Sequence, residues 1–97
     1  MRDYEVTIII KPDIDDESRS QLIDRVAGWL VAEDSSDENL TVDHWGRRTL
    51  AYPIRKYTEG YYVYFEAQIE PVRLAEIERN IQYLDDILRH LVVRKES

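Results

Sequence analysis

Two residue periodicities alternate along this chain, and their order constrains the fold more than any other feature. Apolar residues that alternate with polar ones, rich in β-branched and aromatic side chains, are typical of strands. Apolar residues spaced three and four apart, after acidic N-cap residues or a proline, are typical of helices. The predicted elements are a strand over 4–10, a helix over about 16–32, a strand from 40 that is interrupted near Gly46 and weakens at Pro53, a strand over 61–69, a helix from 71 to about 83 and a strand over 87–95.

This order, βαββαβ, predicts a ferredoxin-like sandwich of the α+β class. Two right-handed βαβ halves place four strands in one antiparallel sheet and both helices on one of its faces. The second and third strands are expected to form a hairpin through a connection over 55–60, with the later half of the second strand at a sheet edge. The polar segment 33–39 is predicted to be a turn. The other face of the sheet is left open for a partner.

Length and composition restrict the class of protein. With 97 residues, of which 43% are hydrophobic and 34% charged, we expect residues 1–97 to form one domain that ends in a short charged stub at about 95–97. The chain contains no cysteine, which excludes disulfides and thiolate metal sites. It has no apolar run of membrane-spanning length and no signal peptide, so we expect a cytosolic protein.

Charge is distributed unevenly along the sequence. The formal net charge is −7, yet residues 44–58 carry four cations and no acid, whereas residues 13–43 carry ten acids and two cations. The basic strip from Trp45 to Lys56, W-G-R-R-T-L-A-Y-P-I-R-K, is therefore predicted to contact phosphate, while the acidic remainder repels nonspecific nucleic acid. Arg47 and Arg48 are neighbours on a strand and point to opposite faces unless the strand bulges beside Gly46. Two solvated edge cations are the alternative.

The aromatic residues of the third strand allow two interpretations. Tyr61, Tyr62, Tyr64 and Phe65 offer stacking platforms for bases, since the RNA-recognition motif uses the same fold. The RNP1 pattern is matched only in part, however, because Glu59 stands where a cation is expected. We therefore expect one face of this strand to be core and the other, with Tyr62 and Tyr64, to be partly covered by a protein partner.

Motifs for catalysis or for a cofactor are missing from the sequence. His44 and His90 have no neighbouring His or Cys at ligand spacing, and no phosphate loop, nucleophile elbow, zinc-protease or calcium motif occurs. An acylphosphatase-like enzyme needs an anion-binding loop after the first strand, where this chain is acidic over 11–16. We expect no enzyme activity, no metal and no cofactor. A ferredoxin-like regulatory or oligomerisation module that binds a small ligand is the alternative function, although it leaves the basic strip without a role.

Four blocks of residues, which together span nearly the whole chain in order, carry a resemblance to a known family. They are M-R-D-Y-E at 1–5, the basic strip at 45–56, G-Y-Y at 60–62 and L-R-H-L-V-V-R at 88–94. The chain resembles the bacterial small-subunit ribosomal protein six family. The resemblance implies the same βαββαβ fold and a structural role in translation, in the small ribosomal subunit of the cytoplasm or of an organelle. Members pair with small-subunit ribosomal protein eighteen, and the pair binds the central domain of the small-subunit ribosomal RNA.

The resemblance also implies which cations face RNA. Compared residue by residue, they are Arg2, Arg47, Arg48, Lys56 and Arg89. About four phosphate contacts would give a log-log salt slope of about −3 to −4, too shallow for an acidic protein to rely on electrostatics alone. We therefore expect a basic protein partner to supply the remaining attraction.

Overall fold

The computed structural model describes residues 2–31 and 40–95. The elements in chain order are β1 (Arg2–Ile10), α1 (Asp16–Leu30), β2 (Thr41–Ile54), β3 (Tyr57–Ile69), α2 (Pro71–Gln82) and β4 (Ile87–Arg94). The first helix ends at Leu30, whereas the end predicted from the sequence, Ala32, and the turn predicted over 33–39 lie outside the described residues.

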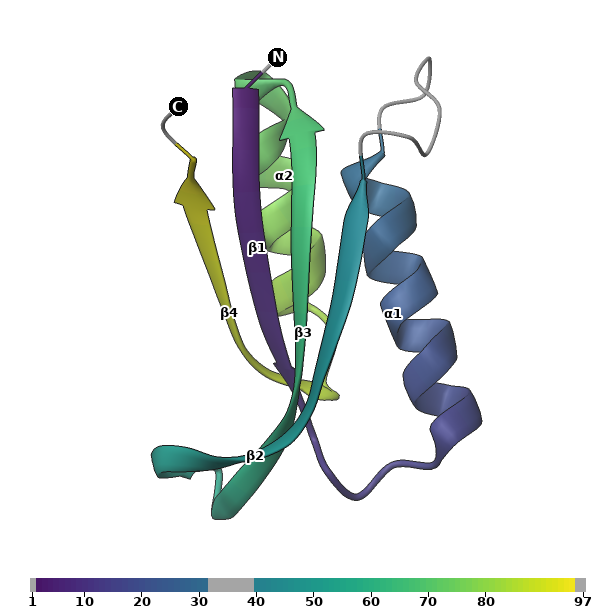
Figure 1. Cartoon of the computed structure of the whole chain (residues 1–97), viewed down its shortest axis with the longest axis vertical. Helices are drawn as coiled ribbons and strands as arrows, with labels where there is room; N and C mark the ends of the chain where they lie inside the picture. Colours follow the sequence, from purple (N-terminus) through teal and green to yellow (C-terminus); the bar gives the residue numbers. More distant parts are fainter. Residues whose placement is uncertain (1, 32–39, 96–97) are drawn as a thin grey trace.

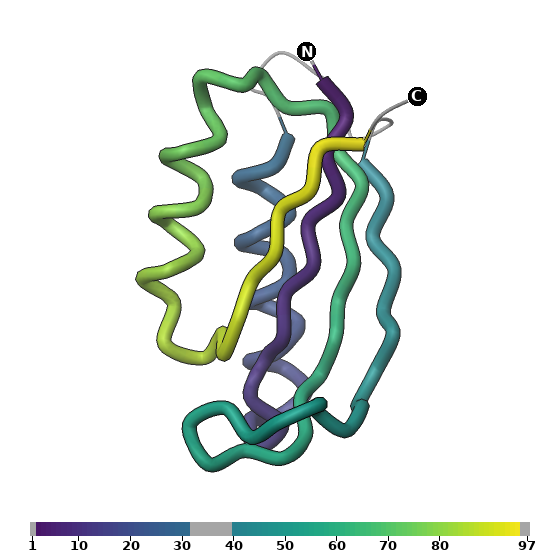
Figure 2. The backbone as a smooth tube through the Cα atoms, turned by 90° about the vertical axis from the view of Figure 1, so that its left-hand side faces the viewer, coloured from purple at the N-terminus to yellow at the C-terminus, as the bar shows by residue number. Residues whose placement is uncertain are grey.

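The four strands form one sheet in the order β2-β3-β1-β4, and each neighbouring pair is antiparallel. Both helices cover the same face of this sheet, and the other face is open (Figure 1, Figure 2). The predicted ferredoxin-like sandwich is thereby confirmed. β2 occupies a sheet edge along its whole length rather than in its later half only.

The core lies between the sheet and the helices, because alternation in β1 and β3 sends every second apolar side chain to the same face. Ile8 of β1 and Phe65 of β3 are among the side chains that are completely buried. The helices add six buried residues: Leu22, Ile23, Val26, Leu30, Ile77 and Ile81. Each such burial contributes about 1.5 to 3 kcal/mol. Since stability comes from this side, the open face is free to carry polar and aromatic residues.

Each helix begins at a residue suited to that position. The carboxylate of Asp15 accepts a hydrogen bond from the backbone N–H of Ser18 at 3.2 Å and so caps α1. That interaction holds the pKa of Asp15 below its usual value. α2 begins at Pro71, which lacks the N–H that would be unpaired in the first helical turn.

β2 and β3 continue beyond the end of β1 as a two-stranded ribbon. The pairing of β1 with β3 ends at the pair Ile10 and Tyr61, and Tyr61 in turn pairs with Arg47, so residues 48–60 extend past it. Figure 1 shows the ribbon bending across the end of the sheet toward the side where β4 begins. The bend therefore determines which side chains of the basic strip lie near the open face of the sheet.

The turn at the tip of this ribbon differs from the sequence-based expectation. It consists of Arg55 and Lys56, which adopt φ values of 48° and 71°, and β3 begins at Tyr57. The predicted connection over 55–60 and the predicted strand start at Tyr61 were therefore wrong. A two-residue hairpin turn with left-handed backbone normally carries Asn-Gly or a related pair, and neither residue type is present here.

Candidate nucleic-acid interface

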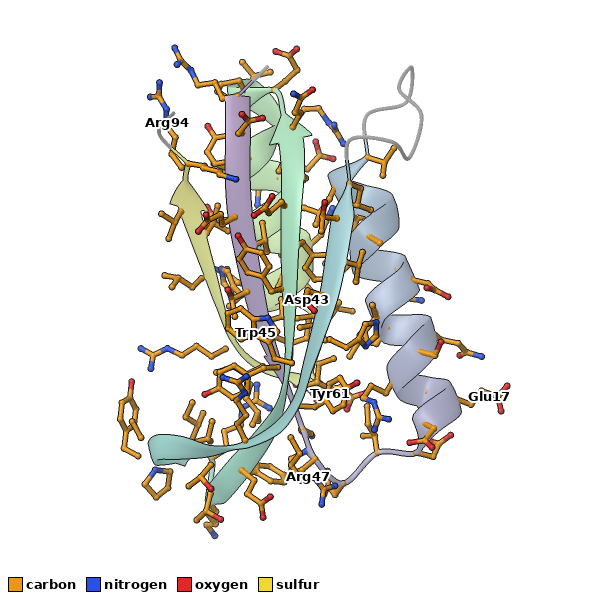
Figure 3. All side chains as sticks on the ribbon, in the orientation of Figure 1. Glu17, Asp43, Trp45, Arg47, Tyr61 and Arg94 are labelled. Carbon is orange, nitrogen blue, oxygen red and sulfur yellow. The ribbon has the colours of Figure 1, made fainter. Side chains whose placement is uncertain are left out.

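The basic strip begins at a bulge in β2. The register with β3 shifts between His44 and Gly46, and Gly46 has a φ of 83°, which glycine adopts at little cost. Trp45 is the extra residue, and its ring stacks on Tyr64 at a centroid distance of 5.2 Å and an interplanar angle of 9°. Its Nε1 donates a hydrogen bond to the carboxylate of Asp43 at 3.1 Å. Figure 3 shows Trp45 and Asp43 in the middle of the molecule and Arg47 near the ribbon.

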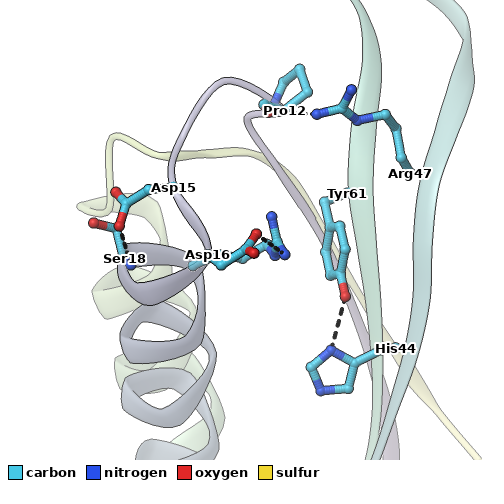
Figure 4. Close-up of polar contacts among 8 residues, drawn as sticks. Pro12, Asp15, Asp16, Ser18, His44, Arg47 and Tyr61 are labelled. Atoms are coloured by element: carbon cyan, nitrogen blue, oxygen red, sulfur yellow. Dashed lines mark hydrogen bonds and ion pairs between the residues drawn. The ribbon is translucent and has the colours of Figure 1, made fainter.

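Arg47 and Arg48 lie on opposite faces of the ribbon. Arg47 donates a hydrogen bond from Nη2 to the backbone carbonyl of Pro12 at 2.8 Å, next to the loop that leads into α1 (Figure 4). The guanidinium of Arg48 lies over the ring of Trp45, 5.1 Å from its centroid. The bulge therefore does not bring the two arginines to one surface. Only Arg48 joins the aromatic residues of the open face.

Arg89 reaches the open face from the opposite edge of the sheet. Its partner in β1 is Ile9, whose neighbours Ile8 and Ile10 point into the core, so Arg89 faces away from the helices. Its guanidinium lies 5.5 Å from the centroid of the Tyr52 ring and donates a hydrogen bond to the Tyr52 hydroxyl. Tyr52 belongs to the bent part of β2, so the bend brings a side chain of one edge strand into contact with a side chain of the other edge strand, β4.

The other two cations predicted to face RNA lie apart from each other. Lys56 is exposed at the tip of the ribbon. Arg2 is exposed at the opposite end of β1, where it pairs with Ile69, and at about 3.3 Å per residue it is roughly 26 Å from Ile10. The structure thus groups Arg48, Lys56 and Arg89 at the ribbon end of the sheet, and it leaves Arg47 and Arg2 outside this group.

The half of the open face away from the ribbon has a different character. Tyr64 donates a hydrogen bond from its hydroxyl to the carboxylate of Glu66 at 2.8 Å. Burial raises the pKa of Tyr64, and the hydrogen bond from Tyr64 lowers the pKa of Glu66. Lys95 lies 3.4 Å from the same carboxylate. Exposed apolar residues of β4 border this region: Leu91 and Val93. These side chains form a surface of mixed acidic, aromatic and apolar character. Tyr62 lies in the row of Arg89 and Gly46, where this surface meets the ribbon end.

A second polar cluster lies between α1 and β2 on the helix side (Figure 4). Arg19 is ion-paired with Asp16 at 2.7 Å, and its guanidinium lies 4.2 Å from the centroid of the Tyr61 ring. The Tyr61 hydroxyl is 3.1 Å from Nδ1 of His44. These contacts join α1 to the hairpin, so His44 has a structural role within the fold.

The remaining titratable side chains are the candidates for a catalytic or metal-binding group. His90 Nε2 lies 3.5 Å from the carboxylate of Glu78 on α2. Within residues 2–31 and 40–95, no three His, Cys, Asp or Glu side chains gather as a metal site would require. In the same part of the chain, neither helix is long and apolar enough to cross a membrane.

Two residues of this surface were missed by sequence reasoning. Tyr52 was counted only as part of a strand pattern, and Arg55 only as a cation of the basic strip. Arg55 donates hydrogen bonds from Nη1 to the carbonyl of Asp85 at 2.9 Å and from Nη2 to the carbonyl of Ile87 at 3.2 Å. Both contacts reach residues 30 and 32 positions away, which local periodicity cannot reveal. The only sequence signal was that both residues fall inside the basic strip.

The fold and this surface define a class of protein: a ferredoxin-like α+β protein whose open sheet face carries arginine and aromatic side chains at one end. A family model described as Ribosomal protein S6 matches residues 3–94. The chain belongs to the ribosomal protein S6 family.

Individual relatives agree with this assignment. The small ribosomal subunit protein bS6 of Desulforamulus reducens is 40% identical over 95 residues, which cover 98% of each chain. The bS6 protein of Alkaliphilus oremlandii is 40% identical over 99 aligned residues that cover 100% of both chains. The crystal structure of 30S ribosomal protein S6 from Thermotoga maritima superposes with a TM-score of 0.84 at 28% identity, covering 97% of this chain and 87% of that one.

Proposed function

We propose that this chain is a noncatalytic structural protein of the small ribosomal subunit in the cytoplasm, and that it binds the central domain of small-subunit ribosomal RNA as half of a heterodimer with small-subunit ribosomal protein eighteen. Family membership supports the first part of the proposal. The observation that carries the second part is the division of the open face into a cationic end and an acidic, apolar half.

The cationic end supports contact with RNA. Arg48 and Arg89 lie on the open face beside aromatic rings, and Lys56 extends from the ribbon tip. Guanidinium groups form paired hydrogen bonds with phosphate and also stack on planar groups. A protein of net charge −7 that offers so few phosphate contacts cannot bind RNA tightly by itself, because each contact releases only about one counterion.

The acidic, apolar half of the open face supports a basic protein partner. Glu66 is held ionised by its hydrogen bond from Tyr64, and Leu91 and Val93 are exposed beside it. Exposed apolar side chains rimmed by polar groups are typical of protein interfaces. A positively charged partner placed here would offset the net negative charge and add its own phosphate contacts.

The proposal is tested by filter binding with a transcript of the central domain, with and without ribosomal protein eighteen. We expect weak binding of this chain alone and much tighter binding by the pair. The double variant Arg47→Ala with Arg48→Ala should weaken the ternary complex by about 1 to 3 kcal/mol, as expected for charge-assisted hydrogen bonds. The matched control is Arg79→Ala, because Arg79 is exposed on α2.

Two results would contradict the proposal. The first is that the pair binds the transcript no better than this chain alone. The second is that the double variant, with a circular dichroism spectrum like that of the wild type, has the same RNA affinity as Arg79→Ala.

A further inference from the structure

The bent ribbon brings together two residues that the flat part of the sheet would keep apart. Cross-strand pairing places Arg89, Ile9, Tyr62 and Gly46 in one row across the sheet. That row spans three strand spacings, or about 14 Å. Tyr52 comes after Gly46 on the far edge strand, yet its ring lies beside Arg89. The side chains of β2 and β4 therefore meet only because the ribbon crosses the end of the sheet.

Two features hold the ribbon in this position. Arg55 binds the carbonyl of Asp85, which precedes β4, and the carbonyl of Ile87, which begins it. Gly60 allows close packing at the base of the ribbon, since a Cβ atom built there would lie 2.3 Å from Cγ2 of Ile9 and 3.6 Å from Cδ2 of Leu50. The contact between Tyr52 and Arg89 is thus held in place by interactions at the tip of the ribbon and at its base.

The chemistry of this pair suits one nucleic-acid component in particular. The Tyr52 side chain is 54% exposed although its hydroxyl is bonded and a guanidinium lies over its ring. Trp45, another large ring at this end, is already engaged by Tyr64 and Arg48. An exposed ring beside a guanidinium provides a stacking surface for a base and a hydrogen-bond donor for its phosphate.

We infer that Tyr52 and Arg89 form a binding site for an unpaired nucleotide of RNA, whose base stacks on Tyr52 and whose phosphate is bound by Arg89. This inference rests on the proposed function and adds the class of nucleotide to it. Bases inside an RNA duplex are stacked on one another, so only a bulged, looped or terminal nucleotide offers a free face. The site therefore distinguishes structured RNA with an extruded base from a continuous helix.

The test measures ternary-complex affinity with ribosomal protein eighteen and the central-domain transcript for three variants. Tyr52→Ala removes the ring, Tyr52→Phe keeps the ring without the hydroxyl, and Tyr83→Ala removes an exposed tyrosine at the end of α2. Stacking of a base on an aromatic side chain corresponds to about a 5- to 140-fold change in affinity. We expect a loss of that size for Tyr52→Ala, a smaller loss for Tyr52→Phe because the ring stays while Arg89 loses its hydrogen bond to the hydroxyl, and an affinity close to that of the wild type for Tyr83→Ala. Ultraviolet cross-linking should also join Tyr52 to a base that is unpaired in the transcript.

Each outcome has a distinct meaning. If Tyr52→Ala binds as well as Tyr83→Ala, or if Tyr52→Phe loses as much affinity as Tyr52→Ala, the stacking site is refuted while the proposed function stands. If the wild-type pair forms no complex with the transcript, the proposed function itself fails and the nucleotide site fails with it.

Discussion

Replacing Arg55 with alanine should release the tip of the β2–β3 ribbon without unfolding the rest of the protein. The substitution removes two hydrogen bonds from a charged donor, one to an exposed carbonyl and one to a partly buried carbonyl. Such bonds contribute about 1.5 to 3 kcal/mol each when shielded. Water replaces part of them at an exposed guanidinium, so we expect the free energy of local opening to fall by about 1 to 2 kcal/mol in total.

Native-state hydrogen exchange measures this change directly. A loss of that size accelerates exchange by about 5- to 30-fold for amides that become exposed only when the ribbon opens. The affected amides should belong to residues 48–60, whereas those of β1 should keep their protection. The variant Arg55→Lys should behave like Arg55→Ala, because one ammonium group does not reproduce the planar fork that reaches both carbonyls.

The matched control is Lys56→Ala. Lys56 occupies the same turn, carries the same charge and also has left-handed backbone, and no hydrogen bond like those of Arg55 ties its side chain to the turn before β4. If Arg55→Ala and Lys56→Ala accelerate exchange in the ribbon equally, or if Arg55→Ala accelerates exchange throughout the sheet, the account of Arg55 as the residue that holds the tip is wrong.

Three further predictions concern other parts of the molecule. Gly60→Ala should destabilise the protein by about 1 to 3 kcal/mol in urea denaturation, because the added methyl group overlaps the β-branched side chain of Ile9; an unchanged midpoint would show that the ribbon base is not closely packed. Asp15→Ala should lower the melting temperature at neutral pH through loss of the α1 cap. The folded-state pKa of Asp15 is lowered, so the ionised carboxylate stabilises the fold above the unfolded pKa of about 3.9, and this contribution is lost as the pH falls through the folded pKa. The difference in melting temperature between the wild type and Asp15→Ala should therefore shrink on acidification. A difference that stays constant with pH would contradict this role. Arg48→Ala should make the log-log salt dependence of ternary RNA binding shallower by about 1, whereas Arg47→Ala should change it less because Arg47 lies on the helix side; equal slopes for the two variants would show that the two faces do not differ.

Much of the fold could be predicted from the sequence because burial imposes periodicity on it. Alternation in β1 and β3 follows from one face packing on the helices, and the proline that begins α2 is a local signal. The start of β3 was predicted too late for a physical reason. Its first pairs with β2, Glu59 with Thr49 and Tyr57 with Ile54, belong to a ribbon that leaves the main core. Between residues 48 and 60 only Leu50 and Gly60 are buried, which is too little to enforce alternation.

The turn at Arg55 and Lys56 could not be predicted because its conformation is imposed by contacts distant in sequence. Left-handed backbone costs about 1 to 2 kcal/mol for a residue with a side chain, and sequence rules therefore assign such turns to glycine or asparagine. Here the two hydrogen bonds of Arg55 to the turn before β4 offset part of that cost. The composition of the basic strip likewise indicated a phosphate-binding region, and strand alternation alone places Arg47 and Arg48 on two faces. Which of the two joins the open face depends on the one-residue register shift at Gly46, which composition does not reveal.

Among the strands of this sheet β1 is synthesised first, yet in the finished sheet it lies in the interior, between β3 and β4. A nascent chain that has emerged as far as α2 can pair β1 only with β3, and the other edge of β1 stays open until Ile87–Arg94 follows. Unpaired strand edges add strands from other molecules. Nascent copies on neighbouring ribosomes therefore expose the unpaired edge of β1 during this interval. The time until β4 is synthesised sets how long each copy is at risk of aggregation.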